Sequence, residues 1–378
     1  MSTTAESPVD SAFLSAANGA GCWMWAGVRL CADGRIDATQ RYADLSWDER
    51  RKRLAEQEAA WLAAQWHAPV PGNRFEVRFA TGPDTQKIQA ALLIRTLAAT
   101  PGEARTLAGQ RVRQAAGPYG TLPPHVTARP ITSPEELRSW LAYPRQAGGF
   151  TEVRKHLSAG RITRGGTGLT YAVCHGFFGS GSAWDAWWRN FAALPFPAVL
   201  SIGFEPYDAD NPAFRELLQR RAAQLEDLAT QGVASPLNPY AVPADPAARA
   251  AAPGYRRALA HYRGPCFTVR VAVASACPLP LAVAESLAGT VSPAAGAVRA
   301  IQVAPAELEQ ATGEFRVLGA PWLAATYQQE VPADPDALDR LLHSLADTQE
   351  ASSVLSLPVH WPGMPAVFGD GPLPAESD

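Results

Sequence analysis

The stretch LTYAVCHGFFGSGSAWDAWWRNFAALPFPAVLSIGF, residues 169–204, decides the fold class. It begins with the apolar run LTYAVC and ends with the apolar run AVLSIGF, and such short runs bounded by Gly or Pro are typical of strands. Between them Trp184, Trp187, Trp188 and Phe191 recur at helical spacing, which predicts an amphipathic helix that packs aromatic side chains on a sheet. The stretch therefore predicts a strand, a helix and a second strand.

The same alternation continues from residue 169 and predicts an α/β (α+β) protein with sheet layers covered by helices. In FEVRF (75–79), Phe75, Val77 and Phe79 are expected to face inward and Glu76 and Arg78 outward. Further strands are expected at QAALLIRTL (89–97), CFTVRVAVA (266–274) and AVRAIQV (297–303). Helices are expected at 46–66, 102–116, 134–142, 151–158, 181–194, 212–230, 247–262, 279–289, 305–318 and 335–346.

Helix starts carry the clearest local signals. Three S/T-x-x-E capping boxes, in which two side chains reciprocally satisfy backbone N–H groups, pair Ser46 with Glu49, Thr100 with Glu103 and Ser133 with Glu136. Asn211-Pro212 and Asp334-Pro335 each place a capping residue before a proline at the first helical position.

Pro- and Gly-rich breaks divide the chain into four predicted parts. The breaks fall at 117–130, 232–246 and the tail. We expect two α/β subdomains plus a helical N-terminal segment. The parts are an N-terminal strand and helix segment at 1–70, a small α+β unit at 71–130, a larger α/β unit at 131–357, and a Pro/Gly-rich tail at 358–378.

Composition excludes several classes of protein. The chain has 378 residues, 47% of them hydrophobic, and a net charge of −3, so no global positive field draws it to nucleic acid. The basic cluster 50–53 is surrounded by acidic residues and is expected to be a solvated helix face. With no basic leader and no apolar run of about 18 residues, a cytoplasmic protein without a membrane span is expected. The five scattered cysteines form no C-x-x-C pair, which favours reduced thiols.

The sequence around Cys174 and His175 resembles the opening of an oxyanion-hole loop in α/β-hydrolases. That fold needs a G-x-S-x-G nucleophile elbow, and none occurs; GVASPLNP stands where it is expected. Ser180 and Ser182 lie in the loop itself, where Ser182 is a plausible helix cap. Cys174 is expected inside the strand, with His175 on the opposite face. A packing helix after a glycine turn explains every residue.

Other chemical patterns are weaker still. GRITRGGTG (160–168) resembles a P-loop, but Gly166 replaces the phosphate-binding lysine, and a helix precedes the loop where a strand is required. The histidines have no metal-ligand spacing, and His343 is expected at a helix edge. Glu226-Asp227 lies on an exposed helix, and Trp47, Leu54 and Trp61 form a packing stripe rather than a base-stacking platform. No catalytic, cofactor-binding or metal-binding residue is therefore assigned, and no cofactor is expected.

Read as a whole, the chain resembles the region that precedes the ATPase domain in HerA-like ATP-binding proteins, relatives of conjugation-type and FtsK–HerA DNA-pumping ATPases. Six segments carry the resemblance, and the last two are similar to the part that leads to the family's P-loop. They are residues 74–113 (paired strands, then a helix), 149–157, 183–207, 255–275, LDRLLHSLADTQEASSVLSLPV (338–359) and WPGMP (361–365).

The resemblance implies a pre-ATPase region without its motor, because the chain reaches Asp378 where the ATPase domain is expected to begin. It transfers no site residue. The function expected from it is a non-catalytic partner or scaffold subunit that binds a HerA-like P-loop ATPase or self-associates, without direct contact to nucleic acid. Two alternatives stay open: a hydrolase of unusual type centred on CHGFFGSGS, and a structural component of a phage-like or secretion assembly.

Overall fold

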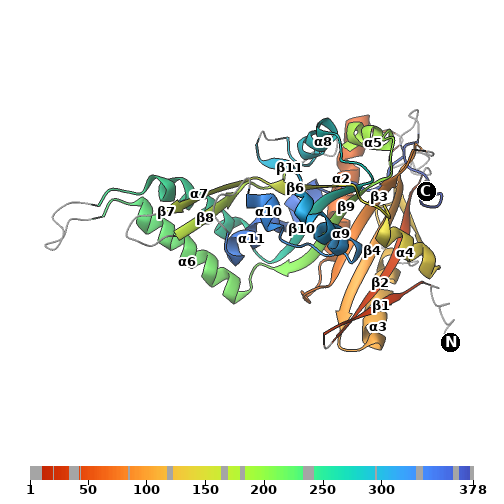
Figure 1. The fold of residues 1–378 in the computed structure, drawn as a ribbon, viewed down its shortest axis with the longest axis horizontal. Coiled ribbons are helices and arrows are strands. Elements are labelled where there is room, and N and C mark those ends of the chain that lie inside the picture. The colour runs from red at the N-terminus through yellow and green to blue at the C-terminus, as the bar shows by residue number, and fades with distance from the viewer. Residues whose placement is uncertain are drawn as a thin grey trace.

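The computed structural model describes residues 11–19, 21–33, 42, 44–83, 86–116, 122–162, 169–178, 184–232, 242–293, 296–328, 335–360 and 366–374. Its centre is a ten-stranded antiparallel sheet that helices cover on both faces (Figure 1). The expected α/β (α+β) class with helix-covered sheet layers is therefore confirmed.

The strand order across the sheet is β1-β2-β4-β3-β9-β10-β6-β11. β5 pairs with the same side of β2 as β1, and β12 pairs with β10. A separate ribbon joins β7 and β8. The strands are β1 (Leu14–Asn18), β2 (Gly21–Ala32), β3 (Arg74–Thr81), β4 (Gln89–Ala98), β5 (Val126–Pro130), β6 (Gly149–Lys155), β7 (Leu157–Ile162), β8 (Leu169–Cys174), β9 (Ala198–Asp208), β10 (Pro265–Ser275), β11 (Val298–Gln302) and β12 (Leu345–Asp347).

Two helical layers bury the two faces of this sheet. Helices α2 (Trp47–Gln65), α3 (Pro101–Ala116), α5 (Trp184–Ala192), α8 (Leu281–Val291) and α12 (Thr348–Ser353) cover one face. The opposite face is covered by α4 (Pro134–Ala142), α9 (Leu308–Arg316) and α10 (Ala324–Gln328). None of the helices in the described ranges is long and apolar enough to cross a bilayer.

An arm projects from the sheet and its two helical layers (Figure 1). Its elements are the β7–β8 ribbon, α6 (Pro212–Ala229) and α7 (Pro246–His261), with α11 (Ala337–Ser344) at its inner end. The arm has its own apolar cluster, in which Phe214, Leu218 and Leu225 of α6 pack with Tyr255 of α7. Because α6 and α7 bury these side chains against each other and the ribbon, the arm is a packed unit rather than an extended loop.

Most predicted helix starts are confirmed. Ser46 forms a complete capping box with Glu49, and Thr100 and Glu103 exchange the same two bonds. Asn211 caps α6 as expected. Ser133 caps α4, but the carboxylate of Glu136 pairs with Arg29 at 2.6 Å instead of closing the box. The last predicted start is wrong, since Asp336 rather than Asp334 caps α11; residue 334 lies outside the described ranges.

The helix predicted at 151–158 is wrong, because this segment contains most of β6 and the start of β7. β6 lies between β10 and β11, with every residue buried. Its charged residues occur at helical spacing but are buried polar groups within a sheet.

The two units predicted at 71–130 and 131–357 contribute strands to the same sheet. β3 and β9, one from each unit, pair directly from Phe75↔Phe204 to Thr81↔Ala198.

A row of buried polar side chains lies on the sheet face beneath α4 and α9. Glu76 and Arg78, expected to point outward, are both fully buried. They belong to a row of polar side chains that crosses five neighbouring strands, which we call the charge belt. Its members are Arg95 of β4, Arg74, Glu76 and Arg78 of β3, Ser201 of β9, Arg270 of β10, and Glu152 and Arg154 of β6.

Carboxylates of the charge belt bridge strands, and its arginines cap helices. Glu76 accepts hydrogen bonds from Arg78 (3.1 Å) and from Ser201 (2.7 Å). Arg78 also donates to the carbonyls of Trp140 and Leu141, at the end of α4, and to that of Phe315, near the end of α9. Helix C-termini carry unpaired carbonyls and partial negative charge, so a buried guanidinium satisfies both needs.

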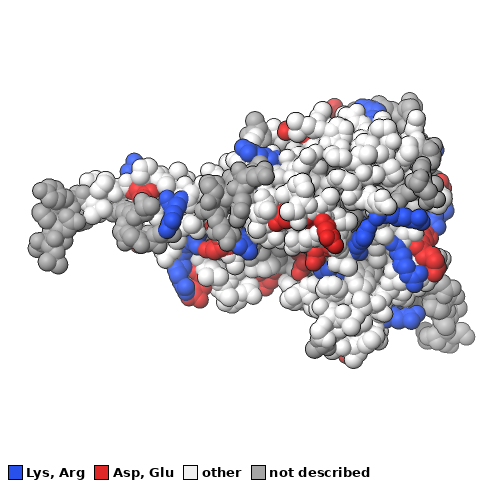
Figure 2. Space-filling model, in the orientation of Figure 1, with Lys and Arg blue, Asp and Glu red and all other residues white. Residues whose placement is uncertain are grey.

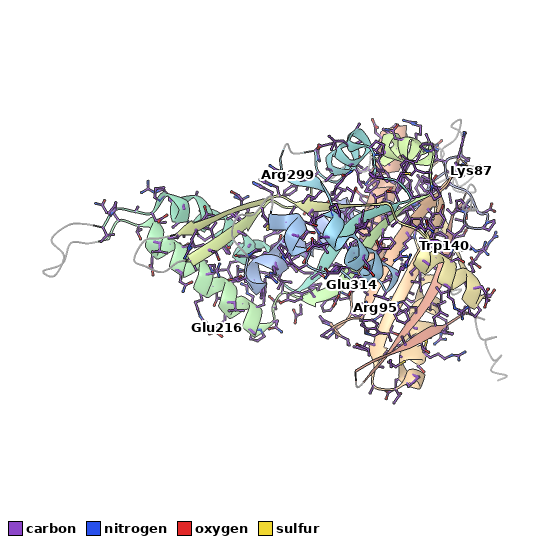
Figure 3. All side chains as sticks on the ribbon, in the orientation of Figure 1. Lys87, Arg95, Trp140, Glu216, Arg299 and Glu314 are labelled. Carbon is purple, nitrogen blue, oxygen red and sulfur yellow. The ribbon has the colours of Figure 1, made fainter. Side chains whose placement is uncertain are left out.

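Arg95 and Arg270 also donate to backbone carbonyls of the helical layer. Arg95 donates to the carbonyl of Val317 at 2.7 Å, and Figure 3 shows it close to Glu314 of α9. Arg270 pairs with Glu152 at 3.1 Å and donates to the carbonyl of Gly319. Burial acts to raise the pKa of Glu152, but Arg154 and Arg270 outweigh it and hold this pKa at about 2. The second helical layer is therefore fixed to the sheet by polar contacts as well as by its apolar cluster.

Replacing Arg78 with Met tests the charge belt. The variant leaves Glu76 buried without its closest cation and removes a donor from three helix-end carbonyls, which is expected to lower the free energy of unfolding by about 3–5 kcal/mol. Urea denaturation measures it. Arg138→Met is the control, because the Arg138–Glu135 pair is largely exposed and is expected to contribute at most about 1 kcal/mol. Equal losses in both variants contradict a structural role for the belt.

Candidate docking site at the base of the arm

A cavity of about 240 Å³ lies at the base of the arm, between the end of β8 and helix α7. Its walls come from four regions that are far apart in the sequence: β8 with the residues after it, α7, α11 and α12. The lining residues are Ala172, Val173, Cys174, His175, Gly176, Phe178, Gly254, Tyr255, Arg257, Ala258, His261, Tyr262, Leu342 and Glu350.

Close packing of α7 on β8 forms the outer wall. Gly254 allows it, because a Cβ atom there would lie 2.4 Å from Cγ1 of Val173. The hydroxyl of Tyr255 accepts from the N–H of Ala172 (3.0 Å) and donates its proton to Asp339 of α11, with the carbonyl of Ala172 at 3.1 Å as a second acceptor within reach. Burial raises the pKa of Asp339 to about 6. One tyrosine thus joins three elements of the arm.

The inner wall is built around the ammonium group of Lys155, at the end of β6. This side chain is fully buried and forms an ion pair with Glu350 of α12 at 2.6 Å. Its Nζ also donates to the hydroxyl of Tyr262 (2.9 Å) and to the carbonyl of Leu345. Three donors with three acceptors make this lysine a fully satisfied structural cation. We call Lys155, Tyr262 and Glu350, with the neighbouring His261, the junction cluster.

Glu350 is the acceptor at the centre of the junction cluster. Burial acts to raise its pKa, but Lys155 and His261 outweigh burial and the pKa is lowered. Gly176 gives the carboxylate its space, because a Cβ atom there would lie 2.3 Å from Oε1 of Glu350. The loop after β8 therefore packs directly on the buried ion pair.

His261, the last residue of α7, closes the junction cluster toward solvent. Its Nε2 lies 3.3 Å from a Glu350 oxygen and 3.2 Å from an Asp347 oxygen, and its side chain is 38% exposed. The hydrogen bond to Glu350 raises the pKa of His261, and Asp347 adds to this effect. The ring therefore links α7 to two carboxylates at the β12–α12 turn, and this link is stronger when the ring is protonated.

The structure corrects the expected place of His175 but not that of Cys174. Cys174 lies in β8 as expected, as its last residue, and is half-buried, whereas His175 follows the strand; both residues line the cavity. Strand alternation does not apply to His175, because β8 has already ended. Burial raises the pKa of Cys174 to about 12, so its thiol stays protonated near neutral pH.

Other residues considered from the sequence have different outcomes. Ser180, Ser182 and residues 163–168 of the P-loop-like segment lie outside the described ranges, and residues 160–162 belong to β7. His343 is not a helix-edge residue: it is buried, lies 2.7 Å from the carbonyl of Lys155, and burial lowers its pKa to about 3. Within the described ranges no cluster of His, Cys, Asp or Glu has the arrangement of a metal site.

The two helix faces considered from sequence are partly explained. Leu54 and Trp61 of the predicted stripe are buried, while the side chain of Trp47 lies outside the described set. In the basic cluster 50–53, Arg51 is buried and pairs with Asp185 of α5, so the cluster is not wholly a solvated face. The acidic residues close to this cluster in the sequence do not include Asp185, so the sequence pattern gave no indication of this distant partner.

Sequence reasoning missed Lys155, His261, Tyr262 and Glu350 as a group. The only local signal was the D-x-x-E pattern at 347–350, which is a helix-start signature, and Asp347 does accept from the N–H of Glu350 at 2.7 Å.

Comparison of the sequence with protein-family models and with curated proteins gives no match.

Substituting His261 with Gln tests the pH dependence of the junction cluster. Since the folded-state pKa is raised, the stabilisation from this histidine is fully present below its unfolded pKa of about 6.5 and is lost as pH rises through the raised value. The difference in unfolding free energy between wild type and variant is therefore expected to be larger at about pH 6 than at about pH 9. Urea denaturation at both pH values measures it.

His175→Gln is the matched control, because His175 lines the same cavity and makes no ion pair among the described residues. Since this substitution removes no ion pair among the described residues, its effect is expected to differ less between the two pH values than that of His261→Gln. If the His261 variant also shows no pH dependence, or a larger effect at high pH, the proposed link between His261 and the two carboxylates is wrong.

Proposed function

We propose that this protein is a non-catalytic partner or scaffold subunit that binds a HerA-like P-loop ATPase through protein–protein contacts in the cytoplasm. The observation that carries the proposal is the exposed aromatic residue at the cavity. Phe178 is 60% exposed and stands beside an apolar-walled cavity at the base of the arm. Aromatic residues next to pockets are typical anchors of protein interfaces.

The position of the junction cluster adds support. Residues 338–359, one of the segments most similar to the region before the family's ATPase domain, supply Leu342, Leu345 and Glu350 to the cavity and to the ammonium of Lys155. A partner that contacts Phe178 therefore touches the surface where this segment meets the arm. The segment 74–113 also has the expected form, with β3 and β4 paired and followed by α3.

The hydrolase alternative has one observation in its favour, namely that Cys174 and His175 line the cavity. Its difficulty is the raised pKa of that thiol, since the thiolate is the nucleophilic form. No hydrogen bond between Cys174 and a histidine occurs among the described residues. The cavity is therefore better suited to hold an apolar group than to attack a carbonyl.

Affinity purification from native cells tests the proposal. The wild-type protein is expected to recover a HerA-like P-loop ATPase, and Phe178→Asp is expected to lose it because a charge replaces the apolar anchor. Leu281→Asp is the matched control: Leu281 is also a large exposed apolar residue (67% exposed), but it lies on α8, away from the arm (Figure 1). Its recovery is expected to stay at the wild-type level.

Three results contradict the proposal. Recovery without any ATPase of this kind removes the partner, and ordered homo-oligomers by light scattering in its absence favour the assembly-component alternative. Esterase activity of the purified protein that is lost in Cys174→Ala or Ser180→Ala favours the hydrolase.

A further inference from the structure

We propose that the cavity binds one large apolar side chain of an acidic segment of the partner protein, with Arg257 pairing an acidic residue next to that side chain. This deepens the proposed function, on which it rests for the existence of a partner. It assigns the chemistry that the partner must present: an aromatic or leucine anchor flanked by Asp or Glu.

The size and walls of the cavity select the anchor. A cavity of roughly 150 Å³ accommodates a benzene ring, so about 240 Å³ is enough for one phenylalanine or leucine side chain. Ala172, Val173, Ala258 and Leu342 present apolar groups to it, and Phe178 offers an exposed ring at its edge. The polar groups on the inner wall are already paired within the junction cluster, so they do not demand a polar occupant.

Charge selects the residues that flank the anchor. From Pro246 to Gly264 the chain carries four arginines and no Asp or Glu, so the helix that forms the outer wall is basic. Arg256 is paired with Glu226 at 2.9 Å, whereas Arg257 lines the cavity, is exposed and makes no ion pair among the described residues. Charges of both signs are visible elsewhere on the arm (Figure 2), so the basic character is local to α7.

The nearby carboxylates do not cancel this preference. Glu350 is compensated by buried Lys155, and Asp347 is paired with His261. Arg257 therefore remains the cation available to an incoming acid at the edge of the cavity. An arginine at the edge of an apolar cavity is complementary to an acidic peptide with one apolar anchor.

Peptide titration tests the proposal without requiring the ATPase. The probe is Ac-Asp-Asp-Phe-Asp-Asp-NH₂ with a 4-fluoro label on the ring, followed by ¹⁹F NMR at low ionic strength. The same peptide with Lys in place of Asp is expected to bind at least about tenfold more weakly. The unlabelled Asp peptide with Ala in place of Phe is expected not to displace the probe.

Two pairs of measurements locate the site. Arg257→Glu is expected to weaken binding at least about tenfold, whereas Arg256→Glu, an equal charge change one residue away and outside the cavity lining, is expected to weaken it less than about threefold. Ala258→Trp, which fills the cavity from a half-buried position, is expected to abolish binding. Circular dichroism confirms that each variant is folded.

Several results overturn the proposal: no binding of the Asp probe, equal binding of the Lys peptide, equal losses in the two arginine variants, or unchanged binding in Ala258→Trp. Displacement of the probe by a short oligothymidylate at equal concentration shows instead a general polyanion surface on α7. These outcomes are separate from the purification test, since an ATPase recovered through another surface leaves the proposed function intact and removes only this cavity assignment.

Discussion

A single buried ammonium group sets the geometry on which the arm and its cavity depend. Lys155 ends β6 with its side chain fully buried, where an unpaired charge is strongly destabilising. Glu350, Tyr262 and the carbonyl of Leu345 must therefore come to it. These partners belong to α12, the end of α7 and β12, so satisfying one lysine fixes three segments around the base of the arm.

The charge belt solves the same problem on the opposite face of the sheet. There, arginines from β3, β4 and β10 donate to carbonyls at or just beyond the ends of α4 and α9. We expect these buried ionic groups to help fix the position of the strands and helices, because a shift of one residue leaves a charge without its partner. The protein thus combines an aromatic core beneath α5, where Trp187 stacks on Phe191 with centroids 4.7 Å apart, with polar as well as apolar contacts on the opposite face.

Local signals account for what the sequence predicts well. Capping residues and helical apolar spacing located α2, α3, α4, α6 and α7 to within one or two residues, because those signals act within one turn. GFTEVRKHL misled because its charges occur at helical spacing, and nothing local reveals that Glu152 and Lys155 meet partners more than a hundred residues away. The same reason explains why Glu76 and Arg78 were expected at the surface: their acceptors lie on helices that only the fold brings near.

The candidate site could be predicted only in part. The CHGFF stretch stands out in the sequence, and all of its residues except Phe177 line the cavity, but the other lining residues on α7, α11 and α12 have no pattern that links them in sequence. The chemistry also changes in context, since burial makes Cys174 a poor nucleophile and pairing makes Lys155 structural. A short motif specified the location of the site, and long-range contacts specified its character.

Hydrogen–deuterium exchange of Lys155→Met tests the central role of this lysine most directly. The account predicts faster exchange in β8 and α7, which the junction cluster holds against the body, with unchanged protection in β3 and β9, which the charge belt and the central sheet hold independently. Unchanged exchange in β8 and α7, or an equal increase across the whole sheet, contradicts it.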